Sequence, residues 1–206
     1  MSPKIHLKEL QLPLFLFLIF VLNVLVYFRA AWTIEPTTKI FEECVRNSGR
    51  ASAGFNLLIL LIVGHWGLKT IYQDRTMKKV FLLMFILFAV NHMIHLFFLT
   101  QYFVLEHREM LSIGQNTRSL ITFVCVILVP IILLRFRTLS KGLYILILAH
   151  IFNVTYLMCK LFYSRYKPYD AAYIHRIGVV IMISSVLYVL YRVYAERGIK
   201  SGKEYK

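Results

Sequence analysis

Long uncharged apolar runs alternate with short polar segments along this chain of 206 residues. A helix of about 20 apolar residues is long enough to cross the hydrocarbon core of a bilayer. The pattern therefore predicts an all-α integral membrane bundle that forms a single domain over residues 1–206. The six expected membrane-spanning helices cover residues 12–28, 51–68, 80–104, 120–134, 142–163 and 171–191.

The composition supports this class of protein. Hydrophobic residues make up 59% of the chain and charged residues 17%, with a mean hydropathy of +0.66. A soluble domain is typically about half apolar and about one quarter charged. Because six spans and their short loops use up the chain, we expect its function to lie inside the bundle or at its two rims.

The 24 Lys and Arg residues, which give a net charge of +14, lie mainly at the ends of the apolar runs. A nucleic-acid-binding surface would instead combine a basic patch with interleaved aromatic residues. The lipid bilayer is therefore the expected partner, and nucleic acid is not. The short segments 69–79 and 135–141 are densely basic, as cytoplasmic loops are. These two basic loops predict that both termini are cytoplasmic.

Four histidines lie in apolar surroundings, namely His65, His92, His95 and His150. An ionisable side chain inside a span is a candidate functional residue, because leaving it unpaired there is unfavourable. Measured along each helix from its basic start, His92 lies about 20 Å deep and His150 about 14 Å deep. His95 lies about one turn beyond His92.

Two imidazoles at similar depth, on helices that run in the same direction, could serve as the axial ligands of a b-type haem. The sequence therefore nominates His92 and His150 as ligands of the haem iron, with His95 as an alternative to His92. These histidines could instead form hydrogen bonds between helices. Two functions stay open: a membrane cytochrome b that transports electrons, and a non-redox scaffold, assembly factor or small-molecule transporter.

Arg50 directly precedes the expected second span, on the side opposite the cytoplasm. Its guanidinium could lie in the interface as an ordinary cation whose aliphatic stem covers apolar surface. It could also bind an anionic or polar group, such as a haem propionate or a quinone head group, with paired hydrogen bonds. The sequence leaves both roles open.

Several motifs fall at the starts and centres of these spans. They are Ser48-Gly49-Arg50 before the second span, Lys78-Lys79 before the third, His92 within the third, and Leu-Ala-His-Ile-Phe-Asn at 148–153 in the fifth. In these motifs the chain resembles the ferric-reductase-like transmembrane family, and within it the haem-binding membrane subunits of the MsrQ (YedZ) type.

The resemblance implies a b-type haem between the third and fifth spans of a cytochrome b-like electron-transport protein. The electrons would come from a flavin or quinol donor, and a separate redox partner protein would complete a membrane oxidoreductase. It also implies a location in the bacterial inner (cytoplasmic) membrane. Tyr163 stands where the family has a second histidine on the fifth helix. One haem of the usual kind is therefore expected, and His107 or Tyr163 could be an unusual ligand of a second.

Overall fold

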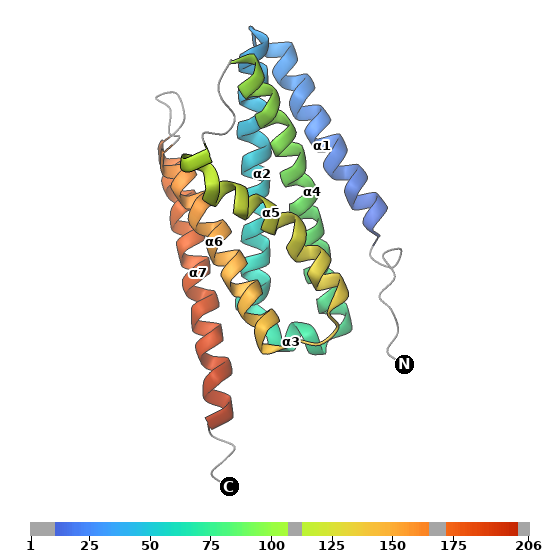
Figure 1. The fold of residues 1–206 in the computed structure, drawn as a ribbon, viewed down its shortest axis with the longest axis vertical. Helices are drawn as coiled ribbons and strands as arrows, with labels where there is room; N and C mark the ends of the chain where they lie inside the picture. Colours follow the sequence, from blue (N-terminus) through green and yellow to red (C-terminus); the bar gives the residue numbers. More distant parts are fainter. Residues whose placement is uncertain (1–10, 107–112, 165–171, 202–206) are drawn as a thin grey trace. The chain divides into compact units, whose positions relative to one another are not determined.

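The computed structural model describes residues 11–106, 113–164 and 172–201. These residues form seven helices and contain no strand (Figure 1). In chain order the helices are α1 (Leu12–Thr33), α2 (Thr37–Trp66), α3 (Leu68–Gln73), α4 (Arg75–Leu105), α5 (Ile113–Arg135), α6 (Lys141–Ser164) and α7 (Ala172–Ser201).

Four helices in the described part of the chain are long and apolar enough to cross a membrane. These helices contain the expected spans 12–28, 80–104 and 142–163 and most of the expected span 171–191. The all-helical fold is confirmed, and these four helices are compatible with a multi-pass membrane protein. The candidate spans are Leu12–Thr33, Arg75–Leu105, Lys141–Tyr163 and His175–Glu196.

The exposed surface of α1 shows why lipid is the expected solvent. Phe17 and Phe28 are 62% and 64% exposed, and Trp32 is 92% exposed. A soluble monomer rarely leaves a large continuous apolar surface in contact with water. In a bilayer the same side chains contact acyl chains instead.

The two remaining expected spans, 51–68 and 120–134, also fall within helices but are not among the four candidates. The apolar part of α5 is the shorter segment Leu120–Arg135, and Pro130 lies inside it. Residues 51–66 form the second half of α2, which ends before Gly67. Polar and charged residues are frequent in the first half of α2, and Ser52, Asn56 and His65 lower the average hydropathy of the second half.

One expectation about the second span is wrong. Ser48-Gly49-Arg50 was expected to precede the helix, whereas α2 begins at Thr37 and these residues lie in its interior. Ion pairs one turn apart support this charged first half, because such pairs stabilise a helix. Arg46 lies 3.3 Å from Glu43 and 3.8 Å from Glu42.

By their contacts the residues divide into two compact units, which are described separately. Unit 1 comprises residues 1–55 and 82–131, and unit 2 comprises residues 56–81 and 132–206. The helices α2, α4 and α5 contribute residues to both units.

In unit 1, α4 lies beside the first half of α2 and beside α1 (Figure 1). Cys44 and Val45 on α2 form a buried apolar cluster with Ala30 on α1 and Phe98 on α4. This packing is the second reason that the charged segment is helical. A narrow apolar stripe on a charged helix is not recognisable as a span, so the sequence pattern placed the helix start too late.

In unit 2, α6 packs against α7. Gly178 on α7 faces the ring of Phe162, 3.5 Å from where a Cβ would lie. Gly64 on α2 lies even closer to α7, because a Cβ there would be 2.5 Å from Cδ1 of Tyr188. Small residues at these positions let the helices approach closely, as membrane helices commonly do.

Lys78, in the first turn of α4, is only 8% exposed. Its Nζ donates to the carbonyl oxygens of Arg137 at 2.7 Å and Phe136 at 3.3 Å, and lies 4.7 Å from the ring centroid of Tyr72. Phe136 and Arg137 directly follow α5, and backbone carbonyls at the end of a helix have no amide one turn ahead to pair with. Lys78 thus connects the α5–α6 turn to the start of α4.

We expect Lys78→Met to lower the free energy of unfolding by about 1.5–3 kcal/mol, the usual contribution of a hydrogen bond to a charged group. Thermal denaturation of the purified protein in detergent measures this change. Lys39→Met is the control, because Lys39 is exposed at the start of α2. Equal melting temperatures for the two variants would contradict the role assigned to Lys78.

Candidate functional site

A stripe of small side chains runs along one buried face of α2. In unit 1 it consists of Cys44, Ser48 and Ser52, which are 0%, 1% and 1% exposed. Residues four apart lie on the same face of a helix, so these side chains point toward the same neighbours. Asn56 continues the spacing into unit 2, where its Nδ2 donates to Oγ1 of Thr155 at 2.8 Å.

Asn91 on α4 is the centre of the polar contacts in unit 1, and it is 0% exposed. Its Nδ2 donates to Oγ of Ser52 at 2.8 Å and to the carbonyl oxygen of Ser48 at 3.0 Å. Its Oδ1 accepts a hydrogen bond from Nδ2 of Asn23 on α1 at 3.2 Å. One amide side chain therefore joins three helices.

Two of the predicted histidines are anchored by the same serines. Nδ1 of His92 lies 3.2 Å from Oγ of Ser52, and Nδ1 of His95 lies 3.0 Å from Oγ of Ser48. The imidazole rings stack with 5.4 Å between centroids, and the ring of Phe123 stacks on His92 at 5.1 Å. The structure therefore brings His92 and His95 together as an oriented pair.

Ser48 contacts both its own helix and the ring of His95. The hydroxyl group of Ser48 donates its single hydrogen to the carbonyl oxygen of Cys44 at 2.7 Å. A neutral His95 that donates its Nδ1 hydrogen to the hydroxyl oxygen of Ser48 would have its lone pair on Nε2. Gly49 makes room for this ring, since a Cβ there would lie 3.3 Å from Cε1 of His95.

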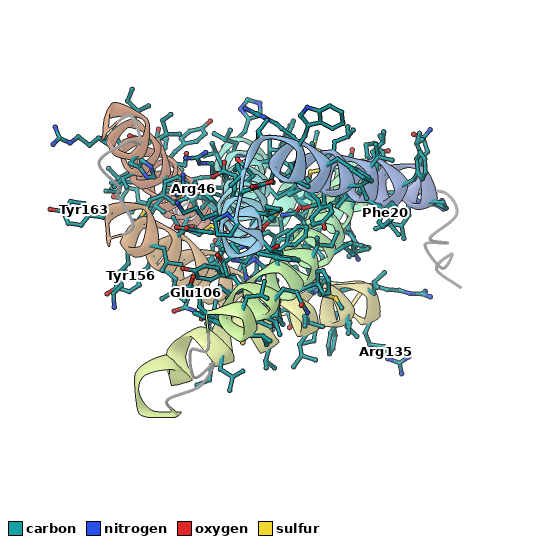
Figure 2. The ribbon with its side chains drawn as sticks, turned by 90° about the horizontal axis from the view of Figure 1, so that it is seen from above. Phe20, Arg46, Glu106, Arg135, Tyr156 and Tyr163 are labelled. Atoms are coloured by element: carbon teal, nitrogen blue, oxygen red, sulfur yellow. The ribbon has the colours of Figure 1, made fainter. Side chains whose placement is uncertain are left out.

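Three of the other predicted site residues belong to the described part of the chain. His150 is 6% exposed on α6 in unit 2, so its pairing with His92 in unit 1 stays a prediction. Tyr163 is 83% exposed near the end of α6 and points away from the ribbon in Figure 2. Arg50 is exposed on α2, with Nη1 3.5 Å from Oδ1 of Asn47. His107 lies outside the described residues.

Among the described residues, no group of three or more His, Cys, Asp or Glu side chains could hold a metal ion. Cys44 is a buried free thiol, and its burial, together with the nearby carboxylate of Glu43, raises its pKa to about 11. A thiol with this pKa stays protonated near neutral pH.

A cavity of about 280 Å³ lies between α1 and α2 in unit 1, next to the polar contacts. Both Asn23 and Ser48 contribute to its wall. Its lining is mixed, with the cation of Arg29, the carboxylate of Glu43 and the amide of Asn47 among apolar residues. A small polar molecule or water could occupy this space.

The sequence pattern drew attention to the histidines and missed Asn23, Asn91 and Ser52. A signal for the two asparagines was present, because each interrupts an otherwise apolar run near its middle. A polar side chain at such a position is retained only where it finds a partner. The four-residue spacing of Ser48 and Ser52 is compatible with a common helix face, but it does not indicate which helix covers that face.

Comparison with known proteins identifies no relative, since the chain matches no family model, no curated protein and no solved structure. The resemblance to the ferric-reductase-like transmembrane family therefore stays a prediction that rests on the short motifs.

The Ser52–Asn91 hydrogen bond can be measured with a double-mutant cycle of Ser52→Ala and Asn91→Ala. We expect a coupling free energy of about 0.6–1.7 kcal/mol, the range for hydrogen bonds between membrane helices. The free energy of unfolding in mixed detergent micelles measures it.

The control cycle pairs Asn91→Ala with Thr33→Ala, because Thr33 is exposed and donates to the carbonyl oxygen of Arg29 in its own helix. This cycle should be additive. Additivity in the Ser52 cycle as well would contradict the contact.

Proposed function

We propose that the chain is a multi-pass membrane protein of the cytochrome b type, which transports electrons through one b-type haem. The observation that supports it best is the serine contact of each histidine on α4, between Nδ1 of His92 and Ser52 and between Nδ1 of His95 and Ser48. A histidine that binds a metal through one ring nitrogen almost always uses the other for such an outer contact. The two imidazoles on α4, each held by a serine, therefore fit the role of a haem ligand.

In this proposal His92 on α4 and His150 on α6 bind the iron, and His95 is the alternative to His92. The pairing with His150 rests on the similar depth of the two residues in their spans and on the resemblance to the ferric-reductase-like family. The haem supplies the one-electron chemistry. The protein supplies the two imidazoles and an apolar surrounding, and Ser52 and Ser48 hold the rings on α4 in position.

The electrons would come from a quinol or from a flavin-containing partner protein, and a separate redox partner would receive them. In this role the chain would be the haem subunit of a membrane oxidoreductase, located in the bacterial inner membrane. Arg50 and Tyr163 are both exposed, so they are better suited to contact a partner or a quinone head group than to hold this haem.

A second function is supported by the same contacts. The serine bonds give His92 and His95 polar partners inside the fold without any cofactor, as in a membrane scaffold, assembly factor or small-molecule transporter. The difference between the two functions is then visible by eye. A haem protein purifies red, with a Soret band and an α-band that appears on reduction, and a non-redox protein purifies colourless.

The haem proposal predicts that His92→Ala and His150→Ala each abolish the reduced-minus-oxidised haem spectrum of membranes that contain the protein. Each change removes one of the two axial bonds from the protein to the iron. His95→Ala should reduce the haem content partially, and His175→Ala, the control, should leave it unchanged. Unchanged spectra in both the His92 and His150 variants would rule out this ligand pair.

We further propose six spans, with α2 and α5 crossing the membrane in addition to the four candidates, and with both termini cytoplasmic. The support is the basic character of segments 69–79 and 135–141. Tags at Met1 and Lys206 should both be inaccessible from the periplasm, and a cysteine label between residues 35 and 50 should be accessible. An active alkaline phosphatase fused to Lys206 would reverse this orientation.

A further inference from the structure

A second pocket lies in unit 2, where α6 begins and where α7 approaches its C-terminal end. Its volume is about 470 Å³. Its lining combines two lysines, Lys69 and Lys141, with the apolar side chains of Leu139 and Ile145. Cations beside apolar side chains favour a ligand that has an anionic head and an apolar body.

Glu196 on α7 positions two of the residues that line this pocket, and it is itself 8% exposed. Its backbone carbonyl oxygen accepts a hydrogen bond from Nζ of Lys69 at 2.9 Å, and its Oε2 accepts one from the hydroxyl group of Tyr144 at 3.2 Å. Its Oε1 lies against Gly67, where any Cβ would collide with it. The wall of the pocket is thereby fixed by contacts among α3, α6 and α7.

Cations outnumber the anion in the pocket lining, which contains Lys69 and Lys141 against the single carboxylate of Glu196. An ammonium group has three hydrogens to donate, and the bond to Glu196 uses one of those of Lys69. Lys141 is exposed at the first residue of α6. The neighbouring segments 69–79 and 135–141 contain seven Lys or Arg residues and a single acidic residue, Asp74.

The apolar part of the lining favours a lipid over a free anion. Ile145 is 56% exposed and lies on α6, a helix that is long and apolar enough to cross the membrane. An acyl chain could follow this surface from the pocket toward the bilayer. Inorganic phosphate would make no use of Ile145 or Leu139.

We propose that this pocket binds the phosphate of an anionic phospholipid head group between Lys69 and Lys141, with an acyl chain on Leu139 and Ile145. Basic pockets between membrane helices bind such head groups, and each nearby lysine contributes about 1 kcal/mol, or about fivefold in affinity. Glu196 is a positioning residue for this site. The proposal goes beyond electron transport and does not depend on a haem.

The test is the affinity of the purified protein in neutral detergent for dioleoyl phosphatidylglycerol, measured by native mass spectrometry. Phosphatidylcholine of the same chain length and inorganic phosphate are the comparison ligands. We expect phosphatidylglycerol to bind more tightly than phosphatidylcholine, and we expect inorganic phosphate not to displace it. Lys69→Gln and Lys141→Gln should each weaken phosphatidylglycerol binding about fivefold.

Arg135→Gln is the matched control, because it removes the same charge from the same basic region and Arg135 does not line the pocket. In Figure 2 its side chain points away from the ribbon. A general attraction of basic surface for anionic lipid would be weakened as much by Arg135→Gln as by Lys141→Gln, and that result would overturn the proposal. Unchanged affinity in the Arg135 variant supports a built site.

Three further outcomes decide the proposal. Equal affinity for phosphatidylcholine would show that the anionic head group is not selected, and displacement by inorganic phosphate would show a free-anion site; either result overturns it. Ile145→Asn should weaken phosphatidylglycerol binding if the acyl chain lies on this residue. Should Lys69→Gln fail to fold, Lys141→Gln still tests the site, because its side chain is exposed.

Discussion

A buried polar side chain in a membrane bundle must find its partner inside the protein, because the surrounding lipid offers none. The part of α2 in unit 1 meets this requirement with small side chains at every fourth residue. Ser48 and Ser52 accept or donate hydrogen bonds while leaving room for α4 to approach, and Asn91 fills that space with an amide that also reaches α1. Close packing and polar pairing therefore come from the same residues, so neither can be changed without the other.

The same requirement decides what the histidines on α4 can do. A serine partner on Nδ1 holds each ring in one orientation. An iron atom binds an oriented neutral imidazole. The same hydrogen bond also satisfies a histidine that binds no metal. The serines thus prepare the ring for a ligand without requiring one, which is why the two proposed functions share their structural basis in unit 1.

The sequence predicted the parts of the fold that depend on local composition and missed those that depend on a neighbour. The candidate spans in α1, α4, α6 and α7 follow from long apolar runs with few polar residues. The helix from Thr37 to Arg50 could not be recognised in this way, because its charges mask a narrow stripe that becomes apolar surface only against Ala30 and Phe98. The contact between Lys69 and Glu196 joins residues 127 positions apart, so no local pattern could indicate it.

The basic residues of unit 2 show that a charge used to infer topology can also have a structural role. Three cations donate to carbonyl oxygens at or near the C-terminal ends of helices. Arg192 donates to Trp66, the last residue of α2, and Lys78 donates to the turn after α5. Lys69 donates to Glu196 in α7. The C-terminal end of a helix carries a partial negative charge, so cations are favourable there. A helix that crosses the membrane from the external side has its C-terminal end at the cytoplasmic rim. Lysines and arginines in loops are also favoured there. In the proposed orientation, Lys69 and Lys78 therefore have two roles at the cytoplasmic rim. They favour the direction of insertion, and they pair with backbone carbonyl oxygens near the C-terminal ends of helices that cross toward the cytoplasm.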